Sequence, residues 1–139
     1  LAGIEEFLKF LVIFLWVSKR KEFDEPIDVM IYMIVAALGF ATVENVLIVL
    51  QGQGDSINIT ILRFLSATLL HALASGLVGY YIGSKKGVRP GLALAIILHG
   101  VYNYFAIQAH SLSLAIVGLT LLSVFVVLSV LFKKIKYIK

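Results

Sequence analysis

Three glutamates and two histidines lie within long apolar stretches of this sequence. They are Glu5, Glu6, Glu44, His71 and His99. An ionisable side chain in a transmembrane helix costs several kcal/mol, so each of them needs a functional or a structural reason. Carboxylates and imidazoles are also the side chains that most often activate water and transfer protons in enzymes. The residue types therefore indicate acid–base chemistry in apolar surroundings.

Four further polar residues are placed to support this chemistry. Lys9 follows the two adjacent glutamates by three and four positions, so on a helix it can pair with one carboxylate and leave the other free. His99 and Asn103 are one turn apart on one helix face, where both side chains can hydrogen-bond one substrate group. Asn45 directly follows the third glutamate, and Arg63 lies near a helix end where long side chains reach the interface.

The elements that carry these residues are predicted to be long apolar helices. The chain has 139 residues, of which 60% are hydrophobic and 14% are charged, with a mean hydropathy of +1.00. Soluble domains have about a quarter of their residues charged. Five apolar runs have the length of a membrane span, roughly 17 to 25 residues; they cover residues 1–17, 27–50, 61–83, 91–109 and 112–132. We expect a single all-α domain over residues 1–139, a polytopic transmembrane helix bundle.

Basic residues cluster in alternate connectors, which predicts the orientation. The clusters cover residues 19–21, 85–89 and 133–139, and the connectors between them lack Lys and Arg. By the positive-inside rule, the basic connectors and the C-terminus are cytoplasmic, in a multi-pass protein of the cell membrane. The net charge of +4 is explained by these helix ends, which contact lipid headgroups, so no nucleic-acid partner is expected. Without cysteine, disulfides, thiolate metal sites and a cysteine nucleophile are excluded. Because there is no initiator methionine, we expect the chain to be part of a larger bundle.

Depth along the helices brings the polar groups together. At 1.5 Å per residue, Glu5, His71 and Asn103 lie about 20 Å from the cytoplasmic edge. On the same scale Glu44 lies at about 24 Å and His99 at about 14 Å. Four helices thus deliver polar side chains to one layer, which predicts a single buried, hydrated site.

Four ordered motifs in these helices resemble the signature of the PrsW family of intramembrane proteases. They are Glu-Glu-x-x-Lys at Glu5–Lys9, Phe-x-x-x-Glu-Asn at Phe40–Asn45, the segment His71–Gly76, and His-x-x-x-Asn at His99–Asn103. This family is similar to the CAAX-processing and bacteriocin-immunity membrane proteins. The resemblance implies additional helices and cleavage of a membrane-anchored, single-span protein such as an anti-sigma factor.

Peptide hydrolysis needs an activated water, stabilisation of the oxyanion and a proton for the leaving amine. In a glutamic mechanism, Glu5 or Glu6 is the base, and the sequence does not choose between them. His71 orients the water or transfers a proton, while His99 and Asn103 donate hydrogen bonds to the oxyanion. The predicted enzyme is therefore an intramembrane endopeptidase.

Three alternatives use the same polar layer. Zinc held by Glu5, His71 and His99 ranks second, because the chain has no His-Glu-x-x-His helix and Lys9 would oppose a dication. We therefore expect a site without metal or other cofactor. A non-catalytic scaffold or immunity-type protein would use the layer to bind a partner helix. A proton-coupled transporter would use it as a relay.

Overall fold

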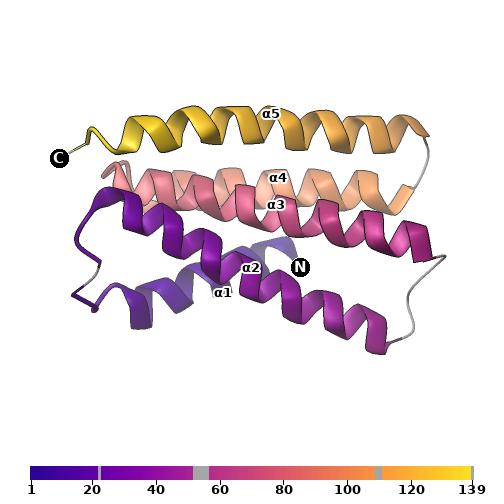
Figure 1. Cartoon of the computed structure of the whole chain (residues 1–139), viewed down its shortest axis with the longest axis horizontal. Coiled ribbons are helices and arrows are strands. Elements are labelled where there is room, and N and C mark those ends of the chain that lie inside the picture. Colours follow the sequence, from indigo (N-terminus) through magenta and orange to yellow (C-terminus); the bar gives the residue numbers. More distant parts are fainter. Residues whose placement is uncertain (22, 52–56, 109–110, 139) are drawn as a thin grey trace.

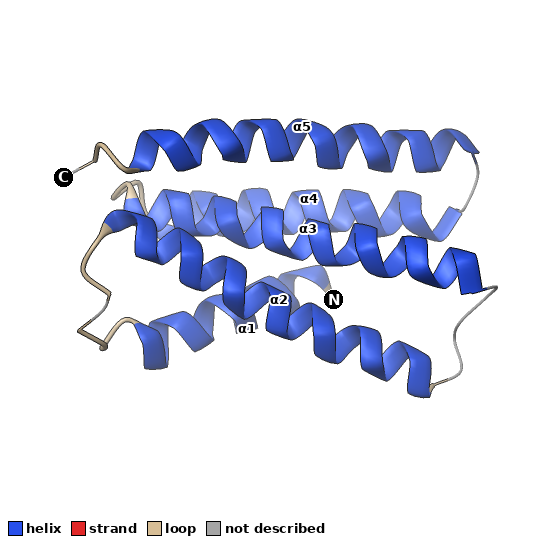
Figure 2. Ribbon diagram, in the orientation of Figure 1, coloured by secondary structure: helices blue, strands red, loops and turns tan. Residues whose placement is uncertain are grey.

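The computed structural model describes residues 1–21, 23–51, 57–108 and 111–138, with only the backbone described at 57–60, 63, 111 and 112. These residues form helices and contain no strand, which confirms the all-α prediction (Figure 2). The helices are α1 (Ala2–Val12) with a π-helical continuation η1 (Ile13–Val17), α2 (Pro26–Leu50), α3 (Ile57–Gly83), α4 (Val88–Gln108) and α5 (Ser111–Ile135). α3 begins before the predicted run of residues 61–83, so residues 57–60 extend a helix instead of belonging to the connector.

Four helices are long and apolar enough to cross a membrane. They are α2, residues 64–83 of α3, α4 and residues 113–135 of α5. The first predicted span, residues 1–17, corresponds to α1 and η1, which have 11 and 5 residues. That length is close to the minimum of about 17 residues for a span, so this fifth span stays a prediction.

Helix α3 is the centre of the bundle and packs against α2, α4 and α5, while α1 contacts α2, α3 and α4 (Figure 1). The connections from α1 to α2 and from α3 to α4 lie at the same end of the bundle as the C-terminus (Figure 1). The three basic clusters therefore share one end. This arrangement agrees with the predicted alternation, whereas the side of the membrane that this end faces stays a prediction.

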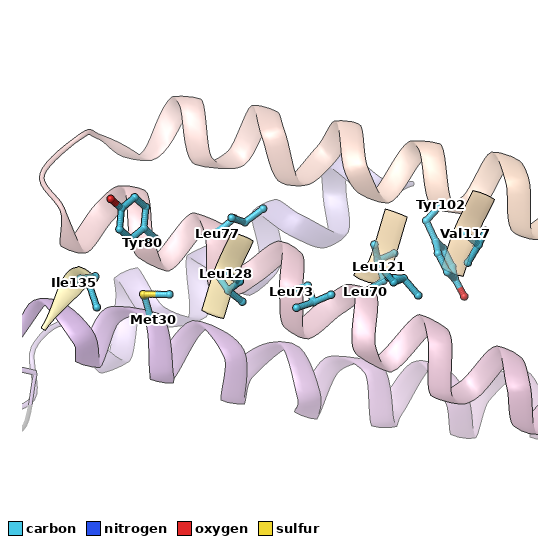
Figure 3. Packing of buried hydrophobic residues seen from close by; sticks show 10 residues of the cluster. All are labelled: Met30, Leu70, Leu73, Leu77, Tyr80, Tyr102, Val117, Leu121, Leu128 and Ile135. Carbon is cyan, nitrogen blue, oxygen red and sulfur yellow. The ribbon is translucent and has the colours of Figure 1, made fainter. Parts of the chain in front are cut away.

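Small residues let α2 and α3 approach closely near the basic end. Ala37 and Ala41 on α2 are 0% and 1% exposed. A Cβ atom added at Gly79 of α3 would lie 2.6 Å from Met30 Cα, so only glycine permits this contact. The main core continues from here along α3 towards α4 and α5 (Figure 3); its buried residues are Met30, Leu70, Leu73, Leu77, Tyr80, Tyr102, Val117, Leu121, Leu128 and Ile135. This core joins α2 to α5, and a second cluster around Ile13, Met33, Ala74, Val78 and Ala95 packs the first helix against α2, α3 and α4.

Candidate active site

Glu6 is the centre of a buried polar cluster. Its Oε1 accepts hydrogen bonds from Lys9 Nζ at 2.5 Å and from His99 Nδ1 at 2.8 Å. Glu6 is 0% exposed and Lys9 2% exposed. The expectation that Lys9 pairs with one glutamate is met, and Glu6 is that partner. A buried carboxylate that is paired and hydrogen-bonded in this way is held in one position.

His71 connects this cluster to α2. Its Nδ1 lies 3.0 Å from Lys9 Nζ and its Nε2 lies 2.8 Å from Glu44 Oε2. An ammonium group has only donors, so Nδ1 accepts from Lys9, and Nε2 carries the proton that it donates to the Glu44 carboxylate. Lys9 and Glu44 together fix both the orientation and the tautomer of His71.

Glu5 has a different environment from Glu6. Its side chain is 16% exposed, and its Oε2 lies 3.4 Å from His99 Nε2. This oxygen is buried and has no hydrogen-bond partner among the described residues. The rings of His99 and His71 meet edge to face, with centroids 4.8 Å apart. Each glutamate thus has one buried oxygen without a hydrogen-bond partner among the described residues, but Glu5 is partly exposed beside His99, whereas Glu6 is fully buried and bonded to Lys9 and His99 through Oε1.

A pocket of about 220 Å³ lies beside Glu5, Glu44, His71 and His99, which form part of its lining. Its lining combines site residues with apolar ones from α1 to α4: Leu1, Glu5, Glu44, Asn45, Ile48, Ala67, Leu70, His71, His99, Tyr102, Asn103, Ala106 and Ile107. A mostly apolar pocket with a few convergent polar groups is the usual form of a ligand or substrate site. It has room for water and for part of a peptide chain.

Among the described side chains, the charges of the cluster do not balance when both imidazoles are neutral. Three carboxylates, of Glu5, Glu6 and Glu44, face one ammonium group, which gives a net charge of −2. Glu5 and Glu44 are 16% and 38% exposed, so the pocket solvates part of this charge, whereas any charge that is buried without a partner is costly. Protonation of both histidines or a bound divalent cation would restore neutrality.

The donor set fits such a cation. One ligand atom each from Glu5, His71 and His99 lies within 4.8 Å of the others. One carboxylate and two imidazoles, with a fourth position left open, form a known type of catalytic zinc site. His99 also donates its Nδ1–H to Glu6, which leaves Nε2 directed towards Glu5. A carboxylate behind a histidine in this way is the usual support of a metal ligand.

The structure brings most of the predicted site residues together. Seven residues share the cluster or line its pocket: Glu5, Glu6, Lys9, Glu44, His71, His99 and Asn103. Asn45 also lines the pocket, but its Nδ2 donates to Thr68 Oγ1 at 3.1 Å and so links α2 to α3. The side chain of Arg63 lies outside the described residues.

One residue of the site was not among the predicted ones. The Phe40 ring centroid lies 5.5 Å from that of His71 and 5.5 Å from Lys9 Nζ. The ring thus covers the Lys9–His71 contact and adds a cation–π interaction. Its position one turn before Glu44, on the same helix face, is the signal that could have identified it.

Comparison with known proteins points to one family. The chain matches the family described as "PrsW family intramembrane metalloprotease" over residues 1–132. It is 37% identical over 111 residues to Protease PrsW of Geobacillus kaustophilus, which covers 74% of this chain and 48% of that protein. It is 32% identical over 112 residues to Protease PrsW of Oceanobacillus iheyensis (75% and 51%) and 30% identical over 110 residues to that of Bacillus subtilis (73% and 49%). The chain thus spans about half the length of these relatives. No solved structure matches it.

Proposed function

Because this chain belongs to the PrsW family of intramembrane proteases, we propose that it forms the catalytic part of a membrane-embedded endopeptidase. Its four apolar helices and this family membership make it an integral, multi-pass membrane protein. The observation that carries the proposal is the Glu5 carboxylate, which lies beside His99 and lines a pocket inside the helix bundle. The substrate is a membrane-anchored protein, such as a single-span anti-sigma factor.

In the proposed glutamic mechanism, Glu5 is the base. It takes a proton from a water molecule in the pocket, and the resulting hydroxide attacks the scissile carbonyl carbon. Glu5 then gives the proton to the leaving amine as the C–N bond breaks. Glu6 is unsuited to this role because its Oε1 already accepts two hydrogen bonds and its side chain is fully buried.

The oxyanion that forms during the attack needs donors. Asn103 lines the pocket one turn after His99 and supplies an amide N–H. His99 would donate from Nε2 in its doubly protonated form, while its Nδ1–H donates to Glu6. His71 donates its Nε2–H to Glu44 and holds this second carboxylate at the pocket wall. Preorganised donors of this kind contribute about 10²- to 10³-fold each to the rate.

A metal-dependent peptidase is the second candidate, and it is favoured by the charge of −2 and by the donor set. Glu5, His71 and His99 would hold the ion, and His71 would have to give up its hydrogen bond to Lys9 or to Glu44 to do so. The ion would supply Lewis acidity and a more acidic bound water. Glu44, 2.8 Å from His71 Nε2, is then the carboxylate left to accept a proton. The sequence suggested that the positive charge of Lys9 would oppose a bound dication. This objection is weaker in the structure, because the Lys9 charge is paired with Glu6.

Reconstitution tests the proposed activity. The full chain is placed in liposomes with a pool of single-span reporter proteins whose juxtamembrane residues vary, and the products are identified by mass spectrometry. We expect cleavage in or next to the span of some reporters, on the side away from the basic clusters. If every reporter stays intact with a protein that is folded by thermal-shift analysis, the peptidase assignment is wrong.

A further inference from the structure

The interface between α2 and α3 changes character along its length. Near the basic end it is closed by contacts to glycine, with the position of a Gly79 Cβ atom only 2.6 Å from Met30 Cα. Beyond Ala41 the small residues stop, and the two ribbons separate towards the α2–α3 connection (Figure 1). Val46 and Val49 in this outer half are 52% and 56% exposed. The two helices therefore form a wedge that opens at the end away from the basic clusters.

A second pocket, of about 310 Å³, lies between α2 and α3 at the open end of this wedge. It is lined by Thr42, Asn45, Val46, Val49, Leu50 and Phe64, which we call the α2–α3 wedge. Four of the six are apolar, and Thr42 donates its hydroxyl to the carbonyl of its own helix at Leu38. The wedge thus offers an apolar surface to the bilayer, with the Asn45 amide at its inner side.

That inner residue, Asn45, also lines the catalytic pocket. On the same helix, Glu44 and Ile48 line the catalytic pocket, whereas Val46 and Val49 line the wedge. The two pockets thus adjoin at Asn45, which lines both of them and whose hydrogen bond from Nδ2 to Thr68 Oγ1 joins α2 to α3. Movement of this side chain would bring the wedge and the site closer to a common opening.

We propose that the α2–α3 wedge admits the substrate sideways from the bilayer and binds an apolar side chain next to the scissile bond. In this proposal, the hydrogen bond between Asn45 and Thr68 holds α2 against α3 until the substrate enters. This inference rests on the proposed peptidase function and specifies the substrate as an extended, apolar segment of a membrane-anchored protein.

The chemistry of Asn45 favours a peptide over a lipid chain as the occupant. A peptide segment that leaves its helix to be cleaved exposes backbone N–H and C=O groups, which need partners inside the membrane. The Asn45 side chain offers one acceptor and two N–H donors, of which the contact with Thr68 uses one. A hydrocarbon chain has no use for these groups. A wedge that adjoins the site, with an amide side chain shared between the two pockets, therefore matches an extended peptide.

A reversible cross-link tests the inference, and the chain has no cysteine to interfere. Val46→Cys and Phe64→Cys place thiols on opposite walls of the wedge, where a short reducible bis-thiosulfonate reagent can join them. The matched control joins the same helices at Ile34→Cys and Ala72→Cys, away from both pockets described above. Two probes are compared: a single-span reporter, and a short soluble peptide with the same cleavage sequence.

Closing the wedge is expected to lower reporter cleavage about tenfold or more, since access through a gate then limits turnover. Reduction restores the rate, the soluble peptide is cleaved as before, and the control cross-link has no effect. Equal reporter cleavage with the wedge open and closed overturns the inference while leaving the peptidase function intact. Equal loss for both probes also overturns it, because the link then disturbs the site itself.

A binding measurement tests whether the substrate enters the wedge, independently of cleavage. The Glu5→Gln variant carries a photoreactive side chain at Val49 in the wedge or, as a control, at the exposed Leu119 of α5. Selective capture of the single-span reporter from Val49 supports the inference, and equal capture from both positions contradicts it. Intact reporter with the parent protein contradicts the peptidase function separately.

Discussion

The two adjacent glutamates of α1 have different surroundings although they are chemically identical. Consecutive helix positions point about 100° apart, so one carboxylate faces the pocket while the other faces the neighbouring helices. Glu6 accepts from Lys9 and His99 through Oε1 and is fully buried, whereas Glu5 lines the pocket. The sequence placed both in the site but could not assign the base, because the choice depends on how α1 is rotated against α3 and α4.

The Lys9–Glu6 pair yields a prediction about stability. Lys9→Met removes the ammonium group and leaves the Glu6 carboxylate buried with only His99, which should destabilise the protein by about 3–5 kcal/mol. Adding Glu6→Gln should recover part of this loss, since the buried charge is then gone. Denaturant unfolding of the single and double variants in one detergent gives the coupling energy. Additive effects would show that the pair is not coupled.

Asn103 is predicted to act in catalysis without a large role in folding. Asn103→Ala removes a donor from the pocket and should lower the rate of reporter cleavage about 10²-fold, with little change in melting temperature. Ser123→Ala is the matched control, because this hydroxyl only donates to the Leu119 carbonyl on an exposed face of α5. An unchanged rate for Asn103→Ala would remove it from the oxyanion site.

Metal analysis separates the two proposed mechanisms. With Glu5 as the base, cleavage should survive prolonged chelation, and Glu44→Gln should affect it less than Glu5→Gln. In the metal-dependent alternative, the parent and Glu44→Gln hold one ion per chain, Glu5→Gln loses it, and both variants are inactive. Elemental analysis of the purified proteins provides a readout independent of activity. Stoichiometric zinc, with activity lost on chelation and restored by zinc, would overturn the glutamic mechanism.

Among the elements, α3 does most to assemble the site, because it contacts every other helix and carries His71. The apolar runs predicted α2 to α5 well, since a membrane span requires length and hydrophobicity that are visible in the sequence. The convergence of Glu44, His71 and His99 could also be predicted from depth. Contacts between neighbouring helices could not be predicted in this way. The contacts of Phe40 and the Asn45–Thr68 hydrogen bond depend on which helices lie next to each other.

Close packing of α2 on α3 predicts the effect of two glycine substitutions. Gly79→Ala would place a Cβ 2.6 Å from Met30 Cα, so the helices must separate and the melting temperature should fall. Overpacking of this kind costs about 1–3 kcal/mol. Gly39→Ala is the control, because its Cβ meets nothing within 4 Å and alanine favours a helix. Equal melting temperatures for the two variants would contradict the packing of α2 against α3.

For the whole molecule, the shared position of the basic clusters predicts its orientation in the membrane. All three lie at one end of the bundle, so Lys86→Cys and Tyr137→Cys should react with a membrane-impermeant thiol reagent only from the cytoplasmic side. Leu50→Cys, at the opposite end of α2 and 76% exposed, should react only from outside. Labelling of position 86 from outside intact cells would reverse the proposed topology and place the site in the other half of the membrane.

The proposed peptide hydrolysis depends on Glu5 as the carboxylate that takes the proton from water. The most direct measurement is the initial rate of reporter cleavage in liposomes by the parent and by Glu5→Gln, with the melting temperature of each. We predict a loss of at least about 10²-fold with an unchanged melting temperature, because glutamine keeps the size of the side chain but can neither accept the proton of water nor return it. Cleavage by Glu5→Gln at the parent rate would contradict the central claim.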